Sequence, residues 1–433
     1  MTTTVNSYEC EAGSTPAPAE LRGRNRDVAQ TVATNVTVIG FTAAGSILAA
    51  RLLGPSGRGQ LAALVAWSAL AVALGDLGIS QACAYYGAQQ HARPGAVAGT
   101  SLALGLSIAA VLILCILPFR FRLFGGVFAG AAALYLLSVP LSVSTTYLGS
   151  ILQGMNRLGA FNAVRLLQST AYAGALTLAT LRGWGHIGAV VQTMVACQAA
   201  ATLLSLMIAS RSLPVRQWRV RRSTARNLLS YGSRSYAGNL FWLTNGRLDQ
   251  ALLSLFAPLS ELGLYAVAVS YASSLFGLGS ALASVVFPRV ALAATAEHGR
   301  RELTRMLRVF CGIVLPLGVV MAVAAPWAIT LVFGAAYRAS ALPARILLVG
   351  GVVLGLNYVI SNALRASGRP GAPAIAEAAG VIVTLSVLPF ALIHWGILGA
   401  AVVSVLSYSM TSLALGLIWK RARRRQSLAG PHE

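Results

Sequence analysis

Lysine and carboxylate side chains are scarce in this chain. Lys420 is the only lysine among 33 basic residues, and only 11 acidic residues oppose them, which leaves a formal net charge of +22. Charged residues make up 10% of the chain, against 56% that are hydrophobic. No soluble domain has this balance, so soluble folds are excluded and any cationic role falls to arginine.

A basic patch of the kind that binds nucleic acid is also missing. The basic residues alternate between the two sides of the predicted membrane spans, with 23 on one side, six on the other and four within spans. This asymmetry follows the positive-inside rule and predicts a multi-pass membrane protein with both termini in the cytoplasm. A nucleic-acid partner is not expected.

Paired cysteines, metal-ligand spacing and catalytic constellations are absent from the sequence as well. The five cysteines stand singly, so no disulfide, metal or other cofactor is predicted. None of the five histidines lies at catalytic spacing from a carboxylate, and every predicted outer connection is short. These features argue against an enzyme, and an integral-membrane glycan polymerase or ligase stands only as an alternative.

Apolar runs of membrane length fill the chain instead. A helix needs about 20 apolar residues to cross a bilayer core. The predicted fold class is therefore an all-α integral membrane protein with about twelve transmembrane helices, at residues 28–50, 60–84, 95–118, 124–150, 160–181, 186–210, 229–257, 263–288, 309–333, 342–364, 371–393 and 396–418.

A basic linker at residues 211–228 divides these spans into two lobes of six, 28–210 and 229–418. Both lobes start on the same side, which predicts a parallel pseudo-repeat. The stretch LGPSGRGQLAALVAW resembles FAPLSELGLYAVAVSY and aligns Gly59 with Gly263, although small residues recur in membrane helices for packing reasons alone. The remaining segments are predicted to be a disordered cytoplasmic tail at 1–27 and a basic tail at 419–433.

Charged residues inside the seventh predicted span are the strongest functional signal. An Arg or Asp near the centre of a membrane helix costs about 2.5 to 3.5 kcal/mol, which is tolerated mainly where the side chain faces a bundle interior or a watery cavity. Treated as one helix, this span carries a polar face, and other spans add single polar side chains. The candidates for the pathway are Arg234, Arg247, Asp249, Tyr231, Asn239 and Asn245 of this span, Arg165 of the fifth, and Arg345 of the tenth.

Three stretches of the sequence resemble a known transporter group. They are LLGPSGRGQLAALVAWSALAVALGDLGISQACAYYGA, YGSRSYAGNLFWLTNGRLDQALLSLFAPLSELGLYAVAVSYASSLFGLGSALASVVFPRVA and NALRASGRPG. They are similar to the polysaccharide-export branch of the multidrug/oligosaccharidyl-lipid/polysaccharide exporter superfamily. The resemblance covers residues 28–420 and implies a two-lobed, twelve-helix transporter that moves lipid-linked oligosaccharides across the bacterial inner membrane by alternating access.

The charged residues of the spans agree with such a substrate. A guanidinium stays charged and its planar fork fits phosphate oxygens, so Arg234 and the other three arginines suit a diphosphate-linked headgroup. Snorkelling to the interface is the alternative for Arg234. A cation-coupled multidrug exporter of the same fold is the alternative function, and it would favour acids in its cavity.

Three carboxylates, Asp249, Asp76 and Glu377, are candidates for coupling transport to H⁺ or Na⁺, because a buried carboxyl can change its protonation as its surroundings change. A static salt bridge is the alternative for Asp249. The expected partners are the lipid-linked oligosaccharide, the membrane lipids, and a polysaccharide polymerase and glycosyltransferases that act on the same glycan.

Overall fold

The computed structural model describes residues 18–89, 93–119, 129–283, 296–367, 369 and 371–428, and all regular structure in these ranges is helical. Eight helices of the described part are long and apolar enough to cross a membrane. The expected all-α membrane class is confirmed, whereas the count of twelve spans stays a prediction.

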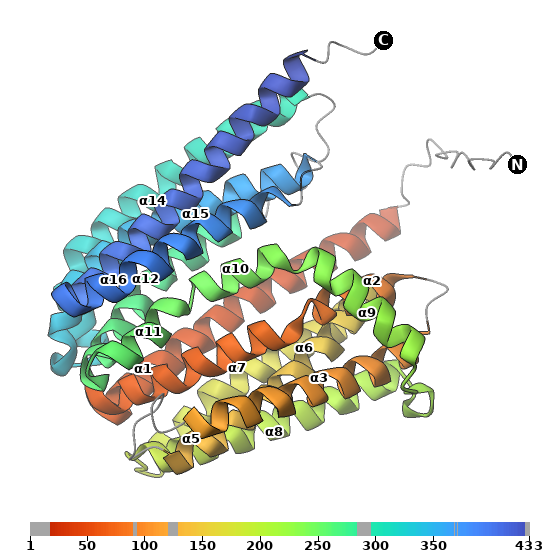
Figure 1. Cartoon of the computed structure of the whole chain (residues 1–433), viewed down its shortest axis with the longest axis horizontal. Coiled ribbons are helices and arrows are strands. Elements are labelled where there is room, and N and C mark those ends of the chain that lie inside the picture. Colours follow the sequence, from red (N-terminus) through yellow and green to blue (C-terminus); the bar gives the residue numbers. More distant parts are fainter. Residues whose placement is uncertain are drawn as a thin grey trace, which may run out of the picture.

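Two groups of helices lie side by side (Figure 1). The first group, the N-lobe, consists of α1 (Pro18–Asp76), α2 (Ile79–Ala88), α3 (Pro94–Ile116), η1 (Leu117–Phe119), α5 (Ala129–Leu136), α6 (Ser138–Gly154), α7 (Leu158–Leu181) and α8 (Ile187–Ser212). The second group, the C-lobe, consists of α10 (Ala237–Asn245), α11 (Leu248–Phe256), α12 (Leu259–Ala283), α14 (Ala296–Phe333), η4 (Ala335–Ser340), α15 (Ala341–Ala366) and α16 (Ala372–Leu428). In the sequence, the two groups are connected by η3 (Val215–Gln217) and α9 (Arg222–Ser235).

The two longest helices each contain two predicted spans. α1 is bent at Gly54 and α16 at Gly396, where φ is 64° and 53°. A positive φ suits glycine and reverses the chain without a long loop. The start of α1 and the end of α16 lie on the same side of the molecule (Figure 1). Of the predicted tails at 1–27 and 419–433, residues 1–17 and 429–433 lie outside the described residues. The described remainder is helical, since α1 begins at Pro18 and α16 ends at Leu428.

Apolar side chains fill the interior of each lobe and also cover its outer faces. The largest buried cluster joins α12, α14, α15 and α16, and two smaller clusters hold the N-lobe together. Large apolar side chains of α14 remain exposed, including Val319, Trp327 and Leu331. A soluble protein rarely exposes so many, so this face suits contact with lipid tails.

The two lobes meet where α1 crosses α12. A Cβ on Gly59 would overlap the carbonyl of Leu259, and a Cβ on Gly263 would overlap the carbonyl of Pro55. The contact is reciprocal, because each glycine faces the residue four positions before the other. These are the glycines that the sequence repeat aligns, so the contact has the form expected of two halves related by a pseudo-twofold axis.

The basic linker is docked on the N-lobe. The Thr100 hydroxyl on α3 accepts a hydrogen bond from the Arg221 amide (3.1 Å) and donates to the Arg219 carbonyl (3.4 Å). α9 continues this docking, because Leu228 is buried in the N-lobe cluster with Ile79 and Val97. The first turns of the predicted seventh span therefore pack with the N-lobe, and the C-lobe helices begin at α10.

The expectation that residues 229–257 form one helix with a single polar face is wrong. The helix is interrupted at Tyr236, between α9 and α10, and again at Gly246 and Arg247, between α10 and α11. Tyr236 keeps helical φ and ψ of −85° and −24°, whereas Arg247 leaves the helical region with φ of −132°. Non-helical backbone at membrane depth is tolerated where it is buried in protein or lines a cavity. The breaks distribute the polar residues of this span over three short helices.

Candidate functional site

An aromatic cluster and a cation lie together on α9 and α2. The ring of Tyr231 stacks on Tyr85, with centroids 4.3 Å apart and planes 16° apart, and meets the edge of Tyr86 at 6.0 Å. Arg234 follows Tyr231 by three residues on the same helix and is exposed. Stacked rings beside an accessible guanidinium can bind a sugar next to a phosphate.

The break between α10 and α11 carries the second predicted arginine. Arg247 is half-buried and lies within electrostatic range of Tyr135 in the N-lobe and of Asp249 and Tyr408 in the C-lobe. Its charge therefore interacts with side chains of both lobes. Asn239 lies on α10, before this break.

The remaining two predicted arginines occupy separate helices. Arg165, on α7, is half-buried and lies over the Phe161 ring, 5.4 Å from its centroid. Arg345, on α15, is exposed and its Nε donates to the Ala322 carbonyl at 2.8 Å. The four predicted arginines thus lie on different elements, two of them in the N-lobe or docked on it and two in the C-lobe or at its α10–α11 break.

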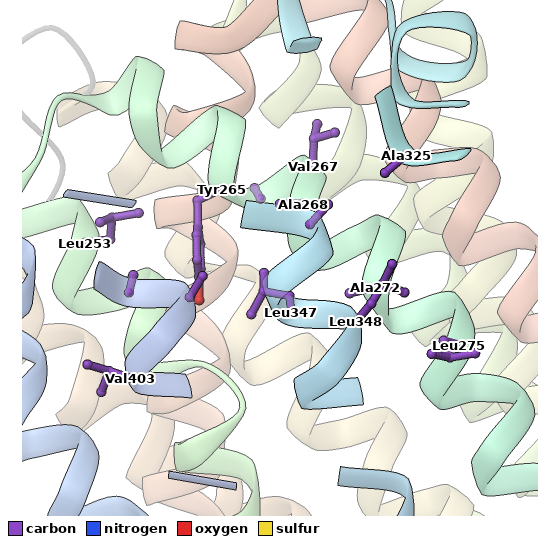
Figure 2. Packing of buried hydrophobic residues seen from close by; sticks show 14 of the residues in the cluster. Leu253, Tyr265, Val267, Ala268, Ala272, Leu275, Ala325, Leu347, Leu348 and Val403 are labelled. Atoms are coloured by element: carbon purple, nitrogen blue, oxygen red, sulfur yellow. The ribbon is translucent and has the colours of Figure 1, made fainter. Parts of the chain in front are cut away.

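Asp249 is buried in the C-lobe among hydroxyl groups. Its Oδ2 accepts hydrogen bonds from the Tyr265 hydroxyl (2.6 Å) and from Ser404 Oγ (3.3 Å), and its Oδ1 accepts from the Gln250 amide (2.7 Å). Figure 2 shows Tyr265 among the apolar side chains of Leu253, Leu347 and Val403. The carboxylate is thus held by neutral donors inside an apolar core.

The salt bridge that the sequence left open for Asp249 is not formed in the described part of the chain, where Asp249 accepts from neutral donors. Of the arginines on other helices, Arg51 donates to the carbonyls of Leu331 and Val332 at 2.6 and 2.8 Å. Arg345 is engaged by the Ala322 carbonyl, as described above.

A second polar cluster surrounds Asn245, at the end of α10. Its Oδ1 accepts from Ser407 Oγ (2.9 Å) and Thr384 Oγ1 (3.2 Å), both on α16. The same Ser407 hydroxyl lies 2.8 Å from the Gly380 carbonyl. Glu377 is buried beside Asn245 and Arg365, at a cavity of about 200 Å³ that Trp242, Asn357, Tyr358 and Ser361 also line.

Asp76 serves a break in the second predicted span. Leu77 and Gly78 have positive φ, 46° and 76°, so α1 ends and α2 starts afresh. Asp76 accepts from the Ser80 amide (3.1 Å) and hydroxyl (2.7 Å) in the first turn of α2. The carboxylate acts here as a cap, because an acidic side chain that accepts from the first amides of a helix stabilises the helix start.

A sequence family described as polysaccharide biosynthesis protein matches residues 47–342, more than half of the chain. The chain belongs to this family. The resemblance inferred from the sequence motifs is confirmed at the level of the family.

Two relatives of this chain carry names that are qualified as probable or putative. The low-salt glycan biosynthesis flippase Agl15 of Haloferax volcanii is 22% identical over 325 residues, which cover 74% of this chain and 68% of the relative. An O-antigen transporter of Shigella flexneri is 20% identical over 292 residues, covering 67% of this chain and 70% of the relative. The named relatives are transporters, not enzymes.

Solved structures confirm the fold. An inward-facing MATE family transporter of the MOP superfamily matches with a TM-score of 0.73 and 16% identity, covering 93% of this chain and all of that one. The lipid II flippase MurJ in an inward closed conformation matches with a TM-score of 0.71 and 13% identity, covering 91% and 87% of the two chains. This polysaccharide biosynthesis protein is therefore a multi-pass membrane protein with the fold of these transporters.

Sequence reasoning missed two features of the site. Tyr85 and Tyr86 carry no signal of their own, because aromatic residues in spans are common, and only the fold brings them to Tyr231. Arg58 is one of the six basic residues counted on the outer side, but it is 7% exposed between the lobes, where it donates to Ser46 Oγ (3.1 Å) and Ser270 Oγ (3.4 Å). Its burial depends on α12, whose Ser270 lies 212 residues further along the chain.

Proposed function

We propose that this protein is an alternating-access flippase for a lipid-diphosphate-linked oligosaccharide, a precursor of a cell-surface polysaccharide. Membership of the polysaccharide biosynthesis family supports the substrate class. The names of the two relatives point the same way, and so does the fold shared with MurJ.

The accessibility of the charged side chains carries the proposal. Arg234 is exposed and Arg165 and Arg247 are half-buried, so the charges that a ligand can reach are cationic. The three candidate carboxylates are 4 to 6% exposed. Asp249 and Asp76 accept hydrogen bonds from neutral groups. A dianionic diphosphate is attracted by the accessible guanidiniums, and the three candidate carboxylates are largely shielded from it.

The rival function is a cation-coupled multidrug exporter, whose fold is the same. Cationic drugs need an accessible anionic or aromatic surface, and here Tyr85, Tyr86 and Tyr231 supply rings but Arg234 stands beside them. The guanidinium would repel a cation. This arrangement favours an anionic lipid headgroup over a cationic drug.

The bacterial inner membrane is the proposed location, with both termini in the cytoplasm and Arg234 near the cytoplasmic side. The distribution of 23 basic residues against six supports this orientation. An impermeant thiol reagent added from outside intact cells should label a cysteine placed at Gly185, in the exposed turn before α8, and spare one at Ser223. The reverse labelling would overturn the orientation.

Transport is proposed to be coupled to a cation through Asp249, with Glu377 as the second candidate. Each is buried on an element that faces the α10–α11 break, where the lobes meet. Asp249 accepts hydrogen bonds from two hydroxyls and one backbone amide and forms no salt bridge, so it can take up or release a proton as the lobes move, whereas a carboxyl locked to an arginine stays ionised. Glycosyltransferases and a polymerase are the proposed partners, upstream and downstream of the flipped glycan.

Arg234→Ala should weaken binding of polyprenyl diphosphate by roughly ten- to hundredfold, the equivalent of a lost charged hydrogen bond. Binding is measured on the purified protein in nanodiscs. Arg234→Lys should retain part of the affinity, since lysine keeps the charge but loses the fork.

Arg222→Ala is the matched control, because Arg222 is also exposed on α9 but lies roughly three helical turns away. It should bind the lipid as the unaltered protein does. Normal binding and export by Arg234→Ala would show that Arg234 only reaches toward the interface and would sink the proposal.

A further inference from the structure

A second cavity, in the N-lobe, is not used by the charged residues described above. Its volume is about 340 Å³, within the range of small-molecule sites. Helices α1, α5, α6, α7 and α8 form its walls, and Leu243 of α10 contributes from the C-lobe. The cavity therefore lies at the lobe interface.

The polar lining of this cavity is neutral. None of the described residues that line it is charged. The side chains that can form hydrogen bonds there are Ser68, Tyr135, Ser138, Ser142, Tyr172 and Gln198. The rest of the lining is apolar. A bound ion would lose its hydration without gaining a counter-charge from these walls, which is costly.

Two of these side chains are buried without a partner in the protein. Ser68 is 7% exposed and its Oγ forms no hydrogen bond, and Gln198 Nε2 is likewise buried and unpaired. Leaving a buried donor or acceptor unpaired costs about 1 to 3 kcal/mol. Such groups at the wall of a cavity are therefore prepared for a ligand that supplies both donors and acceptors.

An uncharged sugar residue can form the hydrogen bonds that Ser68 and Gln198 do not form within the protein. Its hydroxyls both donate and accept, which suits a serine hydroxyl and an amide N–H, and its C–H faces can pack on the rings of Tyr135 and Tyr172. A phosphate, a uronic acid or a cationic drug fits poorly, because none finds a counter-charge in the lining.

We infer that this N-lobe cavity binds an uncharged sugar residue of the transported glycan, with Ser68 and Gln198 as the recognising side chains. The inference rests on the proposed function and adds to it a preference for a neutral glycan. The diphosphate then stays at Arg234, on another part of the pathway, so that charge and sugar are recognised at separate places.

Three probes test the inference on the full-length protein in nanodiscs: bare polyprenyl diphosphate, the same lipid carrying one N-acetylhexosamine, and the same lipid carrying one hexuronic acid. The N-acetylhexosamine lipid should bind more tightly than the other two. Ser68→Ala and Gln198→Leu should each weaken its binding by about tenfold, one hydrogen bond, and leave bare lipid unchanged. Arg234→Ala should weaken all three probes equally.

The melting temperature of the Ser68 variant distinguishes a role in sugar recognition from a structural role. Because Ser68 Oγ has no partner, Ser68→Ala should leave the melting temperature unchanged or raise it while binding falls. Ser205→Ala is the control, since Ser205 is buried on α8 outside the cavity and bonds the Ala201 carbonyl.

If the hexuronic acid lipid binds as tightly as the N-acetylhexosamine lipid, or if Ser68→Ala loses affinity for bare lipid, this inference is overturned and the proposed function still stands. Failure of every lipid diphosphate to bind would overturn the proposed function and this inference together.

Discussion

A single carboxylate, Asp249, offers the sharpest test at the residue scale. Asparagine keeps an oxygen that can accept from Tyr265 and Ser404 but cannot titrate. We expect Asp249→Asn to reach the membrane in normal amounts, to bind substrate, and to lose uphill transport. Membrane abundance, ligand binding and transport driven by a pH or sodium gradient in proteoliposomes measure these outcomes.

Glu261→Gln is the control, because it also removes one negative charge from the C-lobe. Glu261 lies in the first turn of α12 and is only half-buried. Tyr265→Phe removes the main donor while keeping the carboxyl, and should alter the dependence on the gradient without abolishing transport. Full gradient-driven transport by Asp249→Asn would exclude a coupling role, and a collapse in its abundance would indicate a structural one.

The identity of Asp249 as a candidate could be predicted from the sequence, but its surroundings could not. A charged residue within an apolar span can be identified directly from the amino-acid sequence. Its partners Tyr265 and Ser404 lie 16 and 155 residues further along the chain, and nothing local marks either. The same holds for Arg58, whose burial depends on Ser270 of the other lobe.

Two broken helices support each other at the element scale. The α1–α2 break frees the Ala73 carbonyl, which would otherwise accept from the Leu77 amide, and the buried Tyr236 hydroxyl donates to it at 2.6 Å. Tyr236 itself stands at the α9–α10 break. One break therefore satisfies the backbone of the other.

Tyr236→Phe should lower stability by about 1 to 3 kcal/mol, because it leaves the Ala73 carbonyl buried without a partner. Thermal unfolding in detergent gives the shift. Tyr85→Phe, which alters a tyrosine that is largely exposed, should leave the midpoint unchanged. Indistinguishable midpoints for the two variants would mean that water already serves the freed carbonyl.

The presence of helices could be predicted at this scale, but not where they break. Apolar composition identifies a span of about 20 residues whatever its backbone does. Residues 229–257 have membrane length and no proline, so they suggested one helix, and nothing local in the sequence marks the interruptions at Tyr236 and Gly246. The grouping of polar residues on one face failed for this reason.

The arrangement of the whole molecule depends on the joint at Gly59 and Gly263. A methyl group on either would collide with backbone of the opposite helix, which cannot yield as a side chain can. Gly59→Ala and Gly263→Ala should therefore separate the lobes at this joint, and by similar amounts. Gly174→Ala on α7, where a Cβ meets nothing within 4 Å, should change nothing.

A pair of cysteines replacing Ser46 and Ser270 reports the separation, because these hydroxyls from opposite lobes lie 2.7 Å apart. Oxidation should cross-link the pair in the parent and in Gly174→Ala, and less in both joint variants. Unchanged cross-linking in Gly59→Ala would show that the lobes accommodate the methyl group elsewhere.

The Gly59–Gly263 contact also suggests a route by which a chain with two similar lobes can evolve. In a symmetric dimer each subunit presents the same patch, so the patch is complementary to itself. The Gly59–Gly263 contact has this form within one chain, since each glycine meets the carbonyl four residues before its counterpart. A six-helix ancestor with one such glycine would need no second surface to pair with its own copy. Duplication and fusion would preserve that pairing, and one copy could then acquire the neutral cavity while the other acquired Asp249 and Glu377.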